Sequence, residues 1–142
     1  PFHGQGVNAA FEDCTALMEI IDGGAADWET AFEQLQHARQ ANSEAIADMA
    51  LDAFRTMRDS VRHRDFMLRK ALERELEQRH PGVFIPRYSL VMFHRIPYAE
   101  AHRRGRLQAG ILDELLKGKQ QLTDVDLDKA AELVGERLTG FA

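Results

Sequence analysis

The sequence is poor in the features that build disulfides, membrane spans and nucleic-acid interfaces. Its one cysteine, Cys14, excludes an internal disulfide and suits a reducing compartment. No apolar run approaches the roughly 20 residues that cross a bilayer. The formal net charge is −5, whereas general phosphate binding needs an excess of lysine and arginine. We therefore expect a cytoplasmic protein that binds neither membrane nor nucleic acid.

Motifs that place chemistry on side chains are also missing. The six histidines never fall in a His-x-x-x-His or His-Glu-x-x-His spacing, so no metal site is predicted. There is no Gly-x-Ser-x-Gly motif, and nothing near the cysteine would activate it as a nucleophile. Asp124, Asp126 and Asp128 begin like a calcium loop. Because Lys129 stands where that loop needs glycine, a solvated helix cap is the better interpretation. Any chemistry would thus come from a cofactor.

What the chain does have is the composition of a globular helical domain. Of its 142 residues, 44% are hydrophobic and 29% are charged, and only four are proline. A chain of this length can bury one core. We predict a mainly α fold of about five to six helices plus one extended segment.

Apolar residues recur at spacings of three and four along most of the chain, which predicts helices. Asn8 is a candidate N-cap for a helix over 9–22 that would bury Cys14, and Gly23-Gly24 would end it. A helix through residue 57 is apolar on more than one face, which predicts burial between neighbours. The expected later helices start at Asp27, at Asn42 or Ser43, near Phe66, at Pro97 and at a Thr123–Asp126 capping box.

One segment interrupts the helical pattern. His80-Pro81-Gly82 is the strongest break in the chain. The residues that follow are rich in β-branched and aromatic side chains but include Pro86. We expect an extended segment near 83–96 that crosses the core without becoming a central strand.

The most informative motif is the opening Pro1-Phe2-His3-Gly4-Gln5-Gly6-Val7-Asn8. Two glycines one residue apart leave the backbone bare where a helix N-terminus directs N–H groups at an electron-rich ligand. The motif lacks the third glycine and the preceding strand of the dinucleotide fingerprint. A tight turn that merely starts a helix is the alternative. Because a domain seldom begins at such a motif, we expect 1–142 to be a single piece of a larger protein.

Together with segments 49–57 and 84–93, the opening resembles the C-terminal portion of class A flavoprotein aromatic hydroxylases, in particular their bacterial kynurenine-hydroxylating branch. The resemblance extends from Pro1 to about Gly105. It implies that 1–22 is a flavin-facing turn and helix, and that 23–142 is the helical C-terminal region of an α/β FAD-dependent monooxygenase. The implied partners are the N-terminal FAD-binding portion of the same polypeptide and a small aromatic substrate.

The resemblance also implies an activity and a cofactor site. NAD(P)H would reduce the FAD, and one oxygen atom of dioxygen would be added to an aromatic ring, with no side chain acting as a catalytic residue. The amides of the turn would face the N1/C2-carbonyl edge of the flavin, where the reduced ring is negative. Val7 replaces the family's usual methionine. The implied cofactor-binding residues are Gly4, Gln5, Gly6, Val7 and Asn8.

A second set of residues is implied on the substrate side of the ring. Tyr88 follows the Phe-Ile-Pro segment, and its phenol could donate to a substrate carboxylate; a core tyrosine is the alternative. Ala53 and Thr56 stand where the family has an asparagine and a glutamate for an amino-acid head group, which argues for a substrate other than kynurenine. The implied substrate-binding residues are Pro1, Phe2, His3, Ala53, Thr56, Met57 and Tyr88.

The alternative to an enzyme piece is a free-standing helical interaction or regulatory module, in which the glycine-rich opening is an incidental turn. On the hydroxylase interpretation, the 142 residues alone are expected to be inactive. They lack the Gly-x-Gly-x-x-Gly motif for the FAD phosphates and most of the sheet that would wall the substrate pocket.

Overall fold

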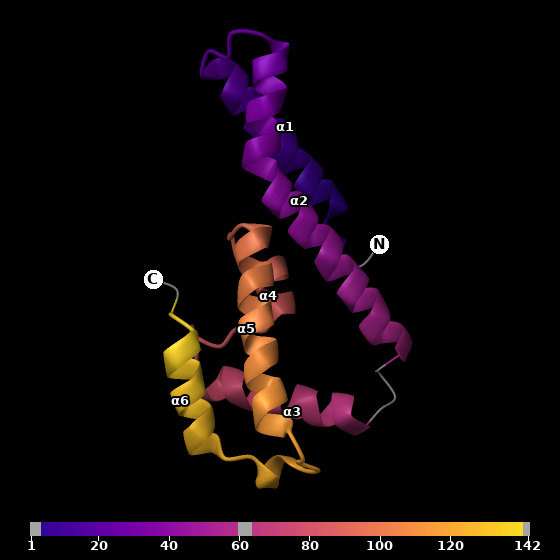
Figure 1. Cartoon of the computed structure of the whole chain (residues 1–142), viewed down its shortest axis with the longest axis vertical. Coiled ribbons are helices and arrows are strands. Elements are labelled where there is room, and N and C mark those ends of the chain that lie inside the picture. Colours follow the sequence, from indigo (N-terminus) through magenta and orange to yellow (C-terminus); the bar gives the residue numbers. More distant parts are fainter. Residues whose placement is uncertain (1–3, 60–63, 141–142) are drawn as a thin grey trace.

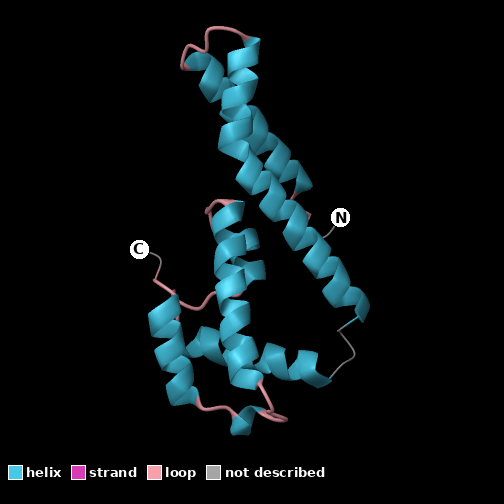
Figure 2. Ribbon diagram, viewed as in Figure 1, coloured by secondary structure: helices cyan, strands magenta, loops and turns pink. Residues whose placement is uncertain are grey.

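The computed structural model describes residues 4–59 and 64–140, and all the regular structure within these ranges is helical (Figures 1 and 2). This confirms the predicted mainly α fold. Within the described ranges, no helix is both long enough and apolar enough to cross a membrane. The elements in order are α1 (Gly6–Asp22), α2 (Trp28–Asp59), α3 (Arg64–Arg79), α4 (Arg87–Phe93), α5 (Tyr98–Leu116), the 3-10 helix η1 (Leu122–Asp124) and α6 (Leu127–Arg137).

The helices form a long hairpin and a smaller bundle (Figure 1). α1 and α2 run antiparallel as the hairpin, and α2 continues past the start of α1. α5 packs against α2 on one side and against α3, α4 and α6 on the other sides. In the view of Figure 2, α2, α3 and α5 lie along the three sides of a triangle.

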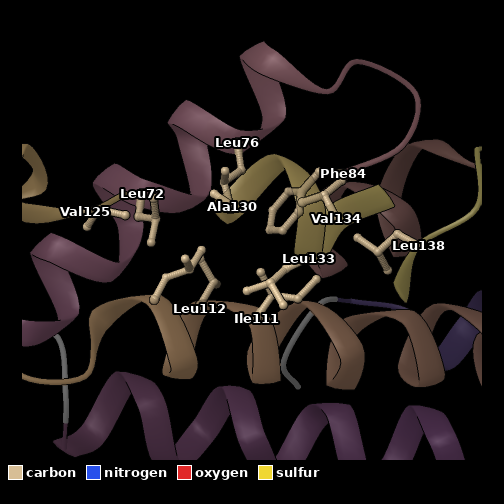
Figure 3. Close-up of a cluster of buried hydrophobic side chains, with 11 residues drawn as sticks. Leu72, Leu76, Phe84, Ile111, Leu112, Val125, Ala130, Leu133, Val134 and Leu138 are labelled. Carbon is tan, nitrogen blue, oxygen red and sulfur yellow. The ribbon is translucent and has the colours of Figure 1, made fainter. Parts of the chain in front are cut away.

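Two clusters of buried apolar side chains hold this arrangement together. α5 contributes to both clusters, so it is the element that joins the hairpin to the bundle. Each fully buried leucine or isoleucine contributes about 1.5–3 kcal/mol relative to an exposed one. The first cluster (Figure 3) contains Leu72, Leu76, Phe84, Ile111, Leu112, Leu115, Val125, Ala130, Leu133, Val134 and Leu138. The second contains Ala45, Met49, Ile85, Leu90, Val91, Tyr98 and Ala101.

The two helices expected from Asp27 and from Asn42 or Ser43 are wrong as separate elements, because α2 runs through both. No glycine or proline interrupts this stretch, so nothing local forces a break. Asn42 does cap a helix, but a different one. Its Oδ1 accepts a hydrogen bond from the backbone N–H of Ala99 at 3.0 Å, in the first turn of α5. Asn42 therefore lies within α2 and caps α5.

The prediction of an extended segment near 83–96 is also wrong, because α4 occupies its middle. Pro86 is the N-cap of α4, with φ −50° and ψ 140°. Proline is compatible with the start of a helix, since the first helical turn leaves backbone N–H groups unpaired anyway. Leu90 and Val91 face the second cluster, which explains why this short helix is stable in its place.

The first and last helices differ from expectation in their N-caps. α1 begins at Gly6 with Gln5 as N-cap, so Asn8 lies inside the helix. The last helix has Asp126 itself as N-cap, and its carboxylate accepts from the backbone N–H groups of Asp128 and Lys129. The predicted Thr123–Asp126 capping box is therefore wrong, although the helix itself is where it was expected.

The apolar stripe of α1 is exposed in this chain, contrary to the expectation that Cys14 is a core residue. No residue of α1 is buried, and Phe11 is 67% exposed. The end of α2 likewise exposes Leu51, Phe54 and Met57, so the predicted burial between neighbours is wrong for that stretch. Amphipathic spacing showed that these faces are apolar, but it could not show what covers them.

Candidate functional site

The glycine turn leads directly into α1 and presents an open backbone. Gly4 has φ +63°, in the left-handed region that favours glycine, and Gly6 is the first residue of the helix. A Cβ atom at either glycine would meet none of the described residues within 4 Å. Within the described residues, the Gln5 side chain makes no capping bond to the first amides of α1. Those amides have no acceptor within the helix, so this end carries the positive part of the helix dipole.

Gln5 points the other way, into the protein. It is 7% exposed, whereas Gly4, Gly6 and Asn8 are exposed and Val7 is 65% exposed. Its Nε2 donates to the sulfur of Met92 on α4 at 3.0 Å. Its Oε1 accepts from Asn8 Nδ2 at 2.7 Å and from the Tyr98 hydroxyl on α5 at 3.3 Å. The side chain of Gln5 therefore anchors the turn, and the backbone of its neighbours faces outward.

Arg39 on α2 binds two adjacent carboxylates on α1. Its Nη2 lies 2.8 Å from Glu12 Oε2, and its Nε lies 2.6 Å from Asp13 Oδ1. The arginine side chain is only 14% exposed. Burial acts to lower the pKa of Arg39, but hydrogen bonds to Asp13 and Glu12 outweigh it, so the pKa is raised. This forked pair fixes the turn-bearing helix to α2.

Tyr98 is the first residue of α5 and is 6% exposed. Burial, and after it the negative charge of Glu12, raises the pKa of the Tyr98 phenol. The hydroxyl is therefore neutral at physiological pH and available as a donor. Sequence reasoning missed both Tyr98 and Arg39. The available signal was weak: Tyr98 starts the apolar stripe of its helix, and Arg39 is one of many arginines.

Four of the predicted substrate residues lie around one hollow. Ala53, Thr56 and Met57 on α2 and Tyr88 on α4 all line a space of about 1490 Å³ that also borders α3 and α5. Tyr88 is 52% exposed, so it is not a core residue in this chain. The other three predicted substrate residues, Pro1, Phe2 and His3, lie outside the described residues.

Two ion pairs lie on the walls of the hollow. Arg87 on α4 donates from Nη1 to Asp52 Oδ2 on α2 at 3.0 Å, and Arg69 on α3 pairs with Asp113 on α5. The Asp52–Arg87 pair sits one residue from Ala53 and one from Tyr88. It therefore fixes the α2 side and the α4 side of the hollow relative to each other.

No family model matches the chain. Curated proteins do match it, among them several named kynurenine 3-monooxygenase. The one from Myxococcus xanthus is 47% identical over 141 residues, which is 99% of this chain and 30% of that protein. The one from Cytophaga hutchinsonii is 46% identical over 117 residues, 82% of this chain and 26% of that protein. The one from Stenotrophomonas maltophilia is 44% identical over 126 residues, 89% of this chain and 28% of that protein.

The matched region of the chain thus covers 26–30% of the length of these three relatives. The resemblance to class A flavoprotein aromatic hydroxylases, based on the opening motif and two later segments, is confirmed by these identities. Its helical structure agrees with the helical portion that the resemblance implied. The chain is a homologue, over nearly its whole length, of part of the bacterial kynurenine 3-monooxygenases, in keeping with the C-terminal portion of such a protein.

Proposed function

We propose that this chain is part of an FAD-dependent, NAD(P)H-using enzyme that hydroxylates a small aromatic substrate. One observation carries the proposal. A bare glycine turn at the N-terminus of α1 occurs in a chain that is 47% identical over 141 residues to a protein named kynurenine 3-monooxygenase. A cytoplasmic location is part of the same proposal.

The turn fits the edge of a flavin ring. Gly4 and Gly6 leave room for a flat ring to approach the backbone, since a Cβ at either position would lie more than 4 Å from the neighbouring described residues. The first amides of α1 would face the N1/C2-carbonyl edge, where a helix N-terminus favours negative charge. Val7 and Asn8 would border the ring, and Gln5 would hold the turn. FAD would supply the redox chemistry, and the protein would supply orientation and electrostatics.

The hollow next to the turn-bearing hairpin is the proposed substrate side. The Tyr88 phenol would donate to an acidic group of the substrate. Ala53 offers no hydrogen bond and Thr56 offers one hydroxyl, so this wall is a weak site for the amino-acid head group of kynurenine. We therefore propose an aromatic substrate that is less polar at that end. Pro1, Phe2, His3 and Met57 complete the proposed contact set.

The exposed stripe of α1 supports a further part of the proposal, namely the partner. Val7, Phe11 and Met18 are 65%, 67% and 56% exposed, and they follow one another at helical spacing with Cys14. An apolar stripe of this length needs a cover in a folded protein. The relatives are roughly three times as long as the matched region. We propose that an N-terminal FAD-binding portion of the same polypeptide covers it, and that the 142 residues alone are inactive.

The first test is flavin binding by the intact protein. We expect a bound flavin spectrum, and we expect oxidation of NADPH or NADH to be stimulated by the true aromatic substrate with a product heavier by one oxygen. An intact protein that binds no FAD would contradict the proposal. If kynurenine stimulates neither nucleotide oxidation nor product formation, the substrate is a different aromatic compound, as Ala53 and Thr56 suggest.

A glycine pair sharpens this test. Gly6→Val places a branched side chain at the open edge of the turn, where the described part of the chain has room for it. Gly135→Val makes the same change in α6, where nothing lies within 4 Å either. We expect the Gly6 variant to lose FAD and the Gly135 variant to keep it. Equal FAD affinity in the two variants would remove the turn from the flavin site.

A further inference from the structure

Among the described residues, the side chain of Gln5 attaches the glycine turn to α4 and α5. Glycines have no side chain with which to pack, so Gly4 and Gly6 cannot anchor it. Gln5 lies between them. Its side-chain amide forms hydrogen bonds with Met92, Asn8 and Tyr98 at distances of 2.7–3.3 Å. A displacement of this amide would therefore move the backbone of the turn.

Tyr98 holds the amide of Gln5 from inside the second cluster. Its ring is buried with Met49 and Leu90, which gives the hydroxyl a fixed place. The hydroxyl donates to Gln5 Oε1 at 3.3 Å. Burial, and after it the negative charge of Glu12 on α1, raises the pKa of this phenol. Tyr98 thus ties the turn to α5 through the side chain of Gln5.

Arg39 in turn decides where Glu12 lies. Its guanidinium contacts Glu12 at 2.8 Å and Asp13 at 2.6 Å, with the side chain 14% exposed. A planar guanidinium can serve two carboxylates in fixed directions, whereas an ammonium group acts as a point charge. Arg39 therefore fixes α1, which follows the turn directly, to α2.

We propose that Arg39 and Tyr98 are positioning residues for the cofactor, which act through Glu12 and Gln5 to hold the glycine turn where FAD would contact it. The inference rests on the proposed function. Neither residue touches the proposed flavin face. Arg39 acts by holding α1 through Glu12, and Tyr98 acts by holding Gln5. The loss of either should therefore change the environment of the flavin more than the stability of the fold.

The experiment uses the intact protein and the variants Tyr98→Phe and Arg39→Lys, both of which keep most of the buried volume. We expect each to raise the dissociation constant of FAD by about fivefold or more, the effect of one lost hydrogen bond, and to shift the flavin absorbance spectrum. The melting temperature of the FAD-free protein should stay close to the unsubstituted value. Arg79→Lys is the matched control, because Arg79 pairs with Glu75 of its own helix and its side chain is 51% exposed.

Unchanged FAD affinity and spectrum in both variants would overturn the inference. So would a loss of affinity that merely follows a loss of melting temperature, which would show a structural role. The Gly6→Val variant separates the two levels of the argument. If Gly6→Val loses FAD while Tyr98→Phe and Arg39→Lys keep it, only the positioning role fails; if the unsubstituted protein binds no FAD, the proposed function itself fails.

Discussion

The side chain of Arg87 crosses α5 at Gly105, where the helix has no Cβ atom in the way. A Cβ at position 105 would lie 2.4 Å from Arg87 Cδ and 2.8 Å from its Cγ, closer than non-bonded carbons approach. Beyond this crossing, Arg87 reaches Asp52 Oδ2 at 3.0 Å. The absence of a side chain at Gly105 is thus what lets α4 connect to α2 across α5.

Gly105→Ala should therefore destabilise the protein by about 1–3 kcal/mol, the usual cost of overpacking a filled site. The matched control is Gly110→Ala in the same helix, because a Cβ at Gly110 meets nothing within 4 Å. There the better helix propensity of alanine should add about 0.5–1 kcal/mol. Denaturant unfolding followed by circular dichroism measures both. Changes of the same sign in the two variants would contradict the role given to Arg87.

Arg104 should matter for a different reason, because it holds the residues just after α6 against the bundle. It is 2% exposed, and its Nη2 donates to the carbonyls of Val83 at 2.9 Å and Thr139 at 2.8 Å. Arg104→Met removes both bonds, which we expect to cost about 1–3 kcal/mol in denaturant unfolding. Arg106→Met, at an exposed position two residues on, should stay within about 0.5 kcal/mol. Equal losses in the two variants would show that the carbonyl contacts contribute nothing.

The link between α5 and α6 should depend on pH. The carboxylate of Glu114 forms ion pairs with Arg137 Nη2 at 2.8 Å and with Lys129 Nζ at 3.0 Å. The hydrogen bond from Arg137, and then that from Lys129, holds the pKa of the Glu114 carboxyl below its ordinary value. Because the folded-state pKa is lowered, the contribution of this carboxylate is present above the unfolded-state pKa. It is lost as the pH falls through the folded-state value.

The measurement is the unfolding midpoint of Glu114→Gln and of the unsubstituted protein as a function of pH. We expect the variant to be the less stable at pH 7, and the difference to shrink below pH 4.5. Added salt should shrink it too, since the pair is exposed. Glu132→Gln on α6 is the control and should not alter the pH profile. A difference that persists unchanged at low pH would show that the ion pairs are not its source.

Proline, glycine and cap residues at helix ends explain which parts of the fold the sequence predicts well. Pro97 stands before α5, and Gly118 follows it with φ +74°, so both ends were readable. Pro86 was misread because proline breaks strands but is tolerated as the residue before a helix. Asn42 was misread because the N–H it caps belongs to Ala99, 57 residues away.

In the candidate site, too, local signals were predictable from the sequence and long-range contacts were not. The glycine turn was predicted because its signal is local and compact. Arg39 and Tyr98 were not, since their partners lie 26 to 93 residues away and no spacing announces them. The exposed stripe of α1 shows a third kind of gap, because periodicity identifies an apolar face without identifying what covers it.

The two tyrosines of the chain should have separable effects. Tyr88 is half-exposed at the hollow, whereas Tyr98 is buried beneath the turn. Tyr88→Phe should weaken binding of the aromatic substrate by about 1 kcal/mol or more, through loss of one hydrogen bond, and leave thermal stability nearly intact. Its FAD affinity should be unchanged. Tyr98→Phe should do the reverse, with weaker FAD binding and little direct effect on substrate.

Substrate binding is measured by titration of the FAD-loaded intact protein, and FAD binding by titration of the flavin-free form. Each variant then serves as the other's control, because both remove one phenolic hydroxyl and nothing else. If Tyr88→Phe lost stability and substrate affinity in proportion, Tyr88 would be a packing residue despite its exposure here. If both variants weakened FAD alone, the hollow lined by Ala53, Thr56 and Tyr88 would not be the substrate side of the ring.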